Sequence, residues 1–230
     1  MLKYKWLLFD ADGTLFNYDK AEANALQKTF FAFGLDFVAR YAEAYREING
    51  KIWLAFERGE ITQNKIRTER FKRLSEAIGI NFDPIAFSQT YLLFLGEGAF
   101  LIEGAEKLLS QLEGQAGLML ITNGLKDVQR SRLAYSTIQH YFSDVVISEE
   151  VGSAKPDAGI FQVAFEKMGN PSKTEVLIIG DSLTSDIRGG NHFGIDTCWF
   201  NPEGKINDQG VSIQYEIRHL HELPLILMLA

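Results

Sequence analysis

The sequence predicts a doubly wound, Rossmann-like α/β core built on a parallel sheet, with an inserted helical domain. Five short apolar runs, flanked by turn or polar residues, are typical of strands buried on both faces. A helical pattern precedes each of the last four runs, and this alternation is typical of right-handed βαβ units. We expect strands at residues 6–9, 118–121, 145–147, 176–179 and 197–200, and helices at residues 104–112, 125–134, 158–168 and 184–193.

About eighty residues after the first expected strand carry helical periodicity and almost no strand pattern. Glycine and proline positions divide this interval into four helices, expected at residues 21–33, 38–58, 62–78 and 83–95. Thr62 is a candidate N-cap, and so is Asp83, because Pro84 follows it at the first helical position. The predicted organisation is an α/β core from residues 1–15 and 97–230 and a helical domain from residues 16–96.

Charge and cysteine content exclude several classes of protein. The 230-residue chain has a formal net charge of -7, and a surface of that sign repels nucleic-acid polymers and anionic membranes. The single cysteine, Cys198, excludes an intramolecular disulfide and a cysteine-cluster metal site. The first residues lead directly into an acidic motif, so we expect a cytoplasmic protein. The apolar run at residues 223–230 is too short to span a bilayer and is expected to form a terminal packing helix.

The first expected strand is followed by two aspartates, Asp10 and Asp12, and then by Gly13. Side chains two residues apart can face one pocket here. A carboxylate attacks phosphorus when a divalent cation offsets the repulsion between the anions, and a second acid can protonate the leaving group and then activate water. The same pair also fits a helix-capping turn or a calcium-type loop without enzymatic work, so it leaves these interpretations open.

Two later strands are followed by residues suited to hold a phosphate. Thr122 comes at the end of one strand with Asn123 and Gly124 behind it, so that a hydroxyl and main-chain amides can approach an anion. Lys155 precedes Pro156 in the loop after the next strand, where a lysine can neutralise a transferred phosphoryl group or the charge of the nucleophile. Taken singly, each also fits an ordinary role, Thr122 as a helix cap and Lys155 as a surface charge.

The fourth expected strand ends in Gly180 and Asp181, with Asp186 five residues further on. Mg²⁺ prefers hard oxygen ligands in an octahedral arrangement, which carboxylates, waters and a substrate phosphate supply together. Asp181 is expected to complete such an oxygen shell. Asp186 is either a further ligand, directly or through water, or an acid that the helix dipole favours at a helix start.

All four groups follow expected strands, and doubly wound sheets bind ligands at the carboxyl ends of their strands. In this order they resemble the four motifs of the haloacid dehalogenase superfamily, in particular of its phosphatases, at residues 10–14, 122–124, 155–156 and 180–186. The resemblance covers nearly the whole chain, and the helical interval is similar to the superfamily's helical cap domain. It implies a magnesium-dependent phosphohydrolase that acts through an aspartyl-phosphate intermediate.

The resemblance also assigns roles to individual residues. It implies that Asp10 is the nucleophile and a Mg²⁺ ligand, and that Asp12 is the general acid and base and offers its main-chain carbonyl to the metal. Asp181 would complete the metal site, and Thr122 and Lys155 would hold the phosphoryl group. Members of the superfamily that displace halide from carbon carry a non-acidic residue at the position of Asp12. Its acid therefore favours phosphate-ester hydrolysis over 2-haloacid dehalogenation.

Other branches of the superfamily retain the same core. A phosphomutase branch is one, and a phosphonate-cleaving branch that uses a cap lysine is another. The phosphonate-cleaving branch is not excluded, because the helical interval contains four lysines, namely Lys28, Lys51, Lys65 and Lys72. Outside enzymes, the alternative is a non-catalytic module that binds a phosphorylated metabolite.

Residues 9–16, 147–156, 186–190 and 196–199 are similar to bacterial nucleotidases that dephosphorylate pyrimidine nucleoside monophosphates. That branch usually has glutamate where this chain has Gly13 and often has proline where it has Glu103. The expected substrate is a nucleoside 5′-monophosphate, with phosphoglycolate or a sugar phosphate as the alternative. We expect a monomer or homodimer, and we expect Phe16 or Tyr18, close to the catalytic loop in sequence, to contact the leaving group.

Overall fold

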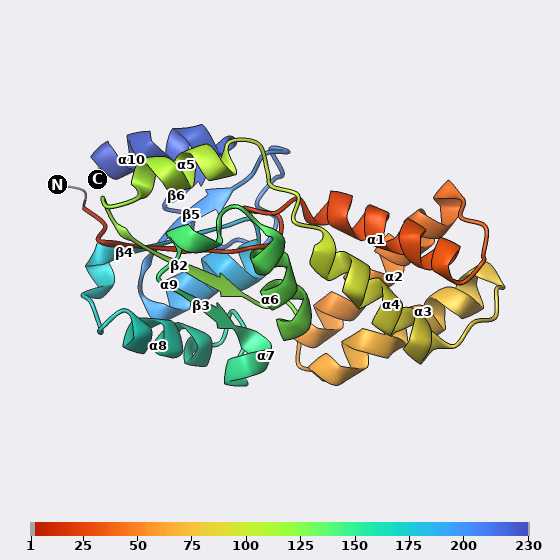
Figure 1. The fold of residues 1–230 in the computed structure, drawn as a ribbon. Coiled ribbons are helices and arrows are strands. Elements are labelled where there is room, and N and C mark those ends of the chain that lie inside the picture. The colour runs from red at the N-terminus through yellow and green to blue at the C-terminus, as the bar shows by residue number, and fades with distance from the viewer. Residues whose placement is uncertain (1–2, 230) are drawn as a thin grey trace. The chain divides into compact units, whose positions relative to one another are not determined.

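A computed structural model describes residues 3–229, and the chain forms two compact units (Figure 1). The first unit comprises Met1–Tyr18, Phe100–Lys126 and Ser136–Ala230, and the second comprises Asp19–Ala99 and Asp127–Tyr135. The last residue of the expected C-terminal helix, Ala230, lies outside the described residues. The domain boundaries expected from sequence, after residues 15 and 96, stay a prediction.

The first unit contains a six-stranded, all-parallel sheet with the order β3-β2-β1-β4-β5-β6. Its strands are β1 (Trp6–Phe9), β2 (Gly117–Thr122), β3 (Asp144–Ile147), β4 (Val176–Gly180), β5 (Asp196–Phe200) and β6 (Tyr215–Ile217). The doubly wound fold and the five expected strands are confirmed, whereas β6 was not predicted. The strand order reverses between β1 and β4, so a ligand site is expected at the carboxyl ends of these two strands.

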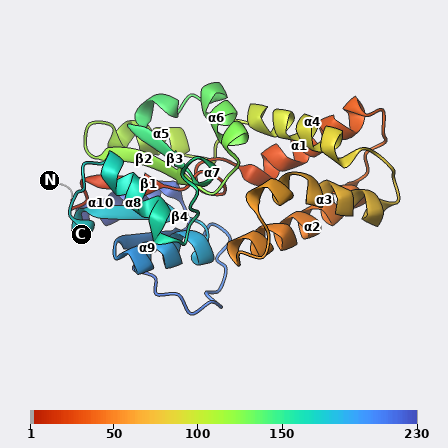
Figure 2. The same cartoon turned by 90° about the horizontal axis from the view of Figure 1, so that it is seen from below.

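Helices cover both faces of this sheet. The helices α5 (Ala105–Leu112) and α10 (Leu223–Leu229) lie on one face, and α8 (Ala158–Lys167) and α9 (Arg188–Phe193) lie on the other (Figures 1 and 2). Between these two helices and the sheet, side chains such as Leu8 and Ile121 of the strands and Phe161 of α8 are fully buried. Because β1 and β4 are covered on both faces, their side chains are almost entirely apolar until the strands end.

Short segments complete the first unit. One is the single-turn helix α7 (Ser148–Val151), which follows β3, and another is a π-helical turn (Leu183–Ile187) directly before α9. Turns of 3₁₀ helix lie at Gln139–Tyr141, Lys173–Glu175 and Leu220–Glu222. The expected helix at residues 184–193 therefore has two parts, and its first part differs from an α-helix. Such π-helical turns occur frequently at functional sites.

The second unit consists of helices around an aromatic core. They are α1 (Tyr18–Ala32), α2 (Ala39–Glu57), α3 (Gln63–Ile78), α4 (Pro84–Glu97) and most of α6 (Lys126–Tyr135). The ring of Phe30 lies 5.3 Å from that of Phe87 and 5.5 Å from that of Tyr41, centroid to centroid. The Asp83 carboxylate caps α4 by accepting from the Ile85 N–H at 2.9 Å, whereas the Thr62 side chain makes no capping hydrogen bond to α3.

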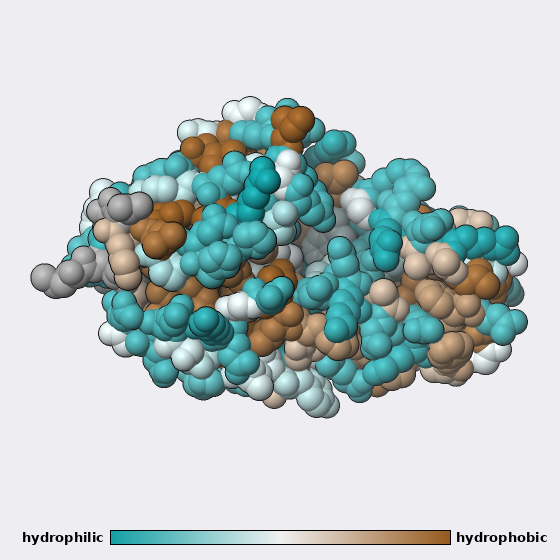
Figure 3. Space-filling model, turned by 90° about the horizontal axis from the view of Figure 1, so that it is seen from above, coloured by the Kyte–Doolittle hydropathy of each residue, from teal (hydrophilic) through white to brown (hydrophobic). Residues whose placement is uncertain are grey.

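Hydrophilic residues dominate the face of the molecule shown in Figure 3, with hydrophobic residues scattered between them. This distribution agrees with the charged composition and is ordinary for a folded surface. Within residues 3–229, no helix combines the length and the apolar character needed to cross a membrane.

Candidate active site

Three carboxylates converge at the carboxyl ends of β1 and β4. Asp10 follows β1, Asp181 follows β4, and Asp186 lies in the π-helical turn. One oxygen from each lies within 4.8 Å of the other two. Asp10 and Asp186 are buried, while the side chain of Asp181 reaches solvent. The strand order alone predicts this place for a site, and the sequence places all three acids there.

A tight turn follows Asp10. The main-chain N–H groups of Leu15 and Phe16 both donate to the carbonyl oxygen of Ala11, at 3.0 and 2.8 Å. Gly13 has a φ of 86°, in the left-handed region, and a Cβ atom placed on it would lie 2.4 Å from Asp181 Oδ2. The turn therefore brings the main chain of Gly13 directly against the carboxylate of Asp181.

Lys155 is a buried cation at the centre of the site. Its Nζ lies 2.6 Å from Asp10 Oδ1, 2.7 Å from Asp186 Oδ1 and 2.8 Å from the carbonyl oxygen of Ile121. Hydrogen bonds to Asp10 and Ile121 and an ion pair with Asp186 hold the ammonium group. Lys155 therefore joins two carboxylates to the end of β2 with its position fully defined.

Asn123 fixes the main chain of Lys155. Its Nδ2 donates to the Lys155 carbonyl oxygen and its Oδ1 accepts from the Lys155 N–H, both at 2.8 Å. Thr122, which is buried, accepts from the Gly124 N–H at 3.0 Å through its hydroxyl. The side chain of Asn123 is thus engaged by the lysine loop, and the Gly124 N–H is engaged by the Thr122 hydroxyl.

The position of Asp186 depends on its neighbours. Its Oδ2 accepts from the Ser182 N–H at 3.0 Å, and the Ser182 hydroxyl accepts from the Ser185 N–H at 3.2 Å. A Cβ atom on Gly180 would lie 2.3 Å from the carboxyl carbon of Asp186. Glycine at the end of β4 is therefore what allows Asp186 to fold back toward Lys155.

Burial and charge shift the ionisation of these groups. Burial raises the pKa of Asp10 to about 7, with the charge of Lys155 opposing the rise and that of Asp186 adding to it. Burial alone would lower the pKa of Lys155, but Asp10 and Asp186 outweigh it and raise that pKa. The pKa of Asp181 is raised well above its ordinary value, because nearby protein atoms displace part of the water around this solvent-reaching carboxylate and Asp10 and Asp186 repel its charge.

A divalent cation fits this set of donors. Three carboxylates and one ammonium leave two negative charges uncompensated, and the repulsion among the acids adds to burial in raising the pKa values of Asp10 and Asp181. The donors are all oxygens, which Mg²⁺ prefers over nitrogen or sulfur. Because Asp181 reaches solvent, an ion could keep part of its water shell, as Mg²⁺ usually does.

The family follows from a match to a known group of enzymes. Residues 4–194 match the model of the haloacid dehalogenase-like hydrolases. The chain belongs to this family. The present chain resembles a crystal structure of the HAD-hydrolase YfnB from Bacillus subtilis, with a TM-score of 0.93 and 40% identity. That structure is described as bound to magnesium and as revealing interdomain movement. The similarity covers 98% of this chain and 99% of that one.

Two curated relatives of this hydrolase carry the name pyrimidine 5′-nucleotidase. YjjG from Escherichia coli (strain K12) is 35% identical over 98% of this chain and 99% of its own length. PynA from Streptococcus pneumoniae (strain ATCC BAA-255 / R6) is 36% identical over 96% of this chain and 93% of its own length.

Most of the candidate site residues expected from the sequence lie together in the structure. Asp12 lies in the turn after Asp10, partly exposed, and its carboxylate is outside the group of three. Phe16 is completely buried, so it is not available to a leaving group as we expected, whereas Tyr18 is partly exposed.

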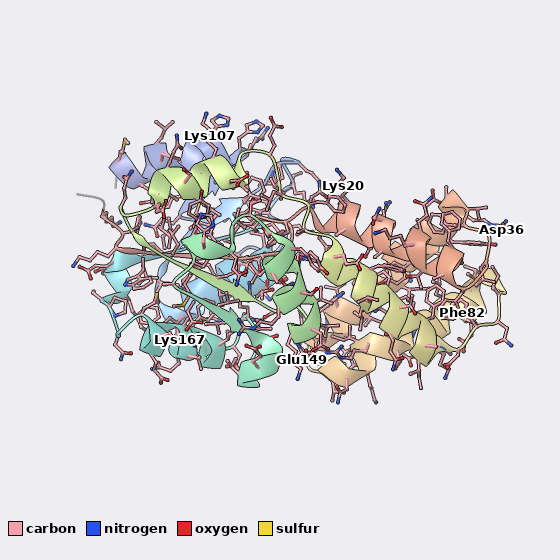
Figure 4. The ribbon with its side chains drawn as sticks, viewed as in Figure 1. Lys20, Asp36, Phe82, Lys107, Glu149 and Lys167 are labelled. Carbon is pink, nitrogen blue, oxygen red and sulfur yellow. The ribbon has the colours of Figure 1, made fainter. Side chains whose placement is uncertain are left out.

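Sequence reasoning missed several neighbours of the site. Thr14 donates to Asp10 Oδ2 at 3.3 Å, and Trp199 donates to the Asp181 carbonyl oxygen at 2.8 Å. Glu149 of α7, labelled in Figure 4, accepts from the Lys126 N–H at 2.7 Å and so holds the end of the Thr122 loop. The sequence gives no periodic signal for such contacts, because they join residues that are adjacent only in the fold.

Proposed function

We propose that this protein is a magnesium-dependent phosphomonoester hydrolase that works through an aspartyl-phosphate on Asp10. The observation that carries the proposal is the contact of Asp10 Oδ1 with the buried ammonium of Lys155, beside the solvent-reaching carboxylate of Asp181. An anionic nucleophile must approach an anionic phosphate here, and a fixed cation beside the nucleophile lowers that electrostatic barrier. Lys155 therefore acts first on the charge of Asp10.

The reaction has two steps. The carboxylate of Asp10 attacks phosphorus, the bond from phosphorus to the ester oxygen breaks, and Asp12 gives its proton to the leaving alkoxide. In the second step Asp12 takes a proton from water, the water oxygen attacks phosphorus, and the Asp10 carboxylate and inorganic phosphate are released. Thr122, Asn123, Gly124 and Lys155 are proposed to bind the phosphoryl oxygens, and the Gly124 N–H would exchange its bond to the Thr122 hydroxyl for one to phosphate.

Asp10, Asp181 and the main-chain carbonyl of Asp12 are proposed to hold the Mg²⁺ ion. When bound, the ion offsets the charge of the carboxylates and of the incoming phosphate. Asp186 is assigned to an outer position, because one of its oxygens contacts Lys155 and the other accepts from Ser182. From there it orients Lys155 and fixes the edge of the metal site.

The substrate is proposed to be a nucleoside 5′-monophosphate, with preference for pyrimidines. The names of YjjG and PynA, which match nearly the whole chain, support this assignment. Phosphoglycolate or a sugar phosphate is the second candidate, because the core chemistry does not depend on the leaving group. The helical segment at residues 16–96 is proposed as the cap domain, and the protein as a cytoplasmic monomer or homodimer.

The test is phosphate release from a panel of nucleoside monophosphates, phosphoglycolate and hexose phosphates, with Mg²⁺ or with EDTA. The expected result is Mg²⁺-dependent release that is strongest on pyrimidine nucleotides. Asp10→Asn should lower it roughly a thousandfold or more, because the amide is a far weaker nucleophile. Asp144→Asn is the matched control, since Asp144 is a partly exposed aspartate outside the site that pairs with Lys167.

The outcomes separate mechanism from substrate. Release mainly from sugar phosphates would retain the mechanism and replace the substrate assignment. A Mg²⁺-independent activity, or one that Asp10→Asn leaves intact, would refute the mechanism. Failure to release phosphate from any ester would favour the metabolite-binding or dehalogenase alternatives.

A further inference from the structure

Asp181 carries the exposed carboxylate of the site, and its main-chain carbonyl accepts a hydrogen bond from a tryptophan. Trp199 Nε1 donates a hydrogen bond of 2.8 Å to the carbonyl oxygen of Asp181. Trp199 lies in β5, is 3% exposed, and pairs with Gly180 in the last register position between β4 and β5. The indole bond therefore lies one residue beyond the end of this strand pairing, where the ladder no longer constrains the chain.

The three carboxylates are fixed in different ways. Asp10 and Asp186 each contact the buried Lys155 ammonium, at 2.6 and 2.7 Å. Asp181 is not an ion-pair partner of Lys155 within the described residues, and its side chain reaches solvent. The direction of its carboxylate consequently depends on the backbone at residue 181 and on the close main chain of Gly13.

We propose that Trp199 is a positioning residue of the metal site. Its indole N–H fixes the peptide after Asp181 and so aims the Asp181 carboxylate at Asp10. This inference rests on the proposed function, since it assumes that the site takes Mg²⁺. An indole suits the task because it is a rigid side chain whose only polar group is a single donor. Groups that orient metal ligands from outside typically change metal affinity by about 10–100-fold when they are lost.

The direct test is calorimetric titration of the metal-free protein with Mg²⁺. Trp199→Phe should weaken Mg²⁺ binding by roughly 10-fold or more. A second variant replaces Trp199 with benzothienylalanine, which retains the shape of indole but has no N–H donor. It should show the same loss, and it separates the hydrogen bond from packing even where Trp199→Phe folds poorly. Trp6→Phe is the control, because Trp6 lies at the opposite end of the sheet, beside Gly117.

Kinetics supply an independent readout. If Trp199 acts through Asp181, the Mg²⁺ concentration for half-maximal activity should rise, and saturating Mg²⁺ should restore kcat with the substrate KM unchanged. Native affinity in the benzothienylalanine variant would overturn the proposal, whether or not Trp199→Phe binds weakly, because the role would then be packing. Absence of Mg²⁺ binding to the native protein would refute the proposed metal-dependent function as well, so the two failures are distinguishable.

Discussion

Lys155 Nζ lies 2.6 Å from Asp10 Oδ1, although 145 positions separate the two residues in the chain. The lysine side chain is 1% exposed and the aspartate side chain 10%. Separating such a pair leaves a charge in a poorly solvated place, so the contact concerns stability as well as chemistry. Both consequences can be measured on one variant.

Lys155→Met should remove the cation while retaining most of the side-chain volume. We expect the metal-free protein to lose about 3–5 kcal/mol of unfolding free energy, because Asp10 and Asp186 stay buried without their partner. Phosphate release should fall by roughly 10²–10³-fold, as when a fixed electrostatic donor is removed from an active site. Urea unfolding and phosphate assays on purified protein measure the two effects.

The control for that variant is Lys167→Met. Lys167 of α8, labelled in Figure 4, pairs with Asp144 at the same distance of 2.6 Å, but these side chains are 39% and 36% exposed. A solvent-exposed pair contributes less than about 1 kcal/mol, so this variant should stay close to the native protein in both assays. Equal losses in the two variants would show that burial of Lys155 does not matter.

Gly180→Ala should displace the carboxylate of Asp186. The added Cβ would lie 2.3 Å from its carboxyl carbon, and the carboxylate would have to leave Lys155 to make space. We expect a loss of about 1–3 kcal/mol from crowding, together with weaker Mg²⁺ binding and lower activity. Thermal unfolding and metal titration of the same samples measure both.

Gly190→Ala is an equally crowded change away from the carboxylates. Its Cβ would lie 2.6 Å from Thr197 Cγ2 and 2.7 Å from Ile178 Cγ2. It should lose a similar stability of about 1–3 kcal/mol and keep the native affinity for Mg²⁺. If Gly180→Ala also kept that affinity, the position of Asp186 would have no bearing on the metal site.

Much of the core was predictable because the central strands are buried on both faces. β1 and β4 are unbroken apolar runs, so their ends, and with them Asp10 and Asp181, could be located from the sequence. β6 has three residues, including the exposed Glu216, and leaves no apolar run to detect. The sequence thus located the acids at the strand ends but missed the outermost strand.

The contacts that complete the site were not predictable in the same way. Asn123 binds the main chain of Lys155 across 32 positions, and Trp199 reaches Asp181 across 18. Neither contact follows from a period of 2 or 3.6 residues, because both depend on how separate βα units pack. The π-helical turn was missed as well, since it accompanies a hydrogen bond from the main-chain N–H of Ser182 to the Asp186 carboxylate, which has no periodic sequence signal.

Gly96→Ala should destabilise the helical unit although alanine favours helices. A Cβ on Gly96 of α4 would lie 2.9 Å from both Cβ and Oγ of Ser131 in α6. We expect a loss of about 1–3 kcal/mol from this crowding. Adding Ser131→Gly should recover much of it, and urea unfolding of the two single variants and the double variant gives the coupling energy.

Gly50→Ala is the control for the contact between Gly96 of α4 and Ser131 of α6. Gly50 lies within α2, and no atom lies within 4 Å of the place that an alanine Cβ would take, so alanine should stabilise the protein by about 0.5–1 kcal/mol. Additive effects of Gly96→Ala and Ser131→Gly would mean that the two residues are not in energetic contact.

The affinity for Mg²⁺ should depend on pH because of Asp10. Its pKa is raised to about 7 by burial in the metal-free protein, so below that pH a proton must leave before the carboxylate can bind a cation. The apparent association constant should rise with pH below about pH 7, roughly tenfold per pH unit for each proton released, and Asp181, whose pKa is also raised, can add a second proton. Calorimetry in buffers of different ionisation enthalpy counts the protons directly.

The raised pKa of Asp10 also determines how the free energy of unfolding of the metal-free protein changes with pH. The ordinary pKa of an aspartate is 3.8, so between about pH 4 and 7 the folded metal-free protein retains a proton on Asp10 that the unfolded chain has lost. The contribution of Asp10 to stability should therefore fall as the pH rises through this interval, and saturating Mg²⁺ should offset the fall. An affinity for Mg²⁺ that is constant between about pH 5 and 7, with no proton release, would contradict the raised pKa.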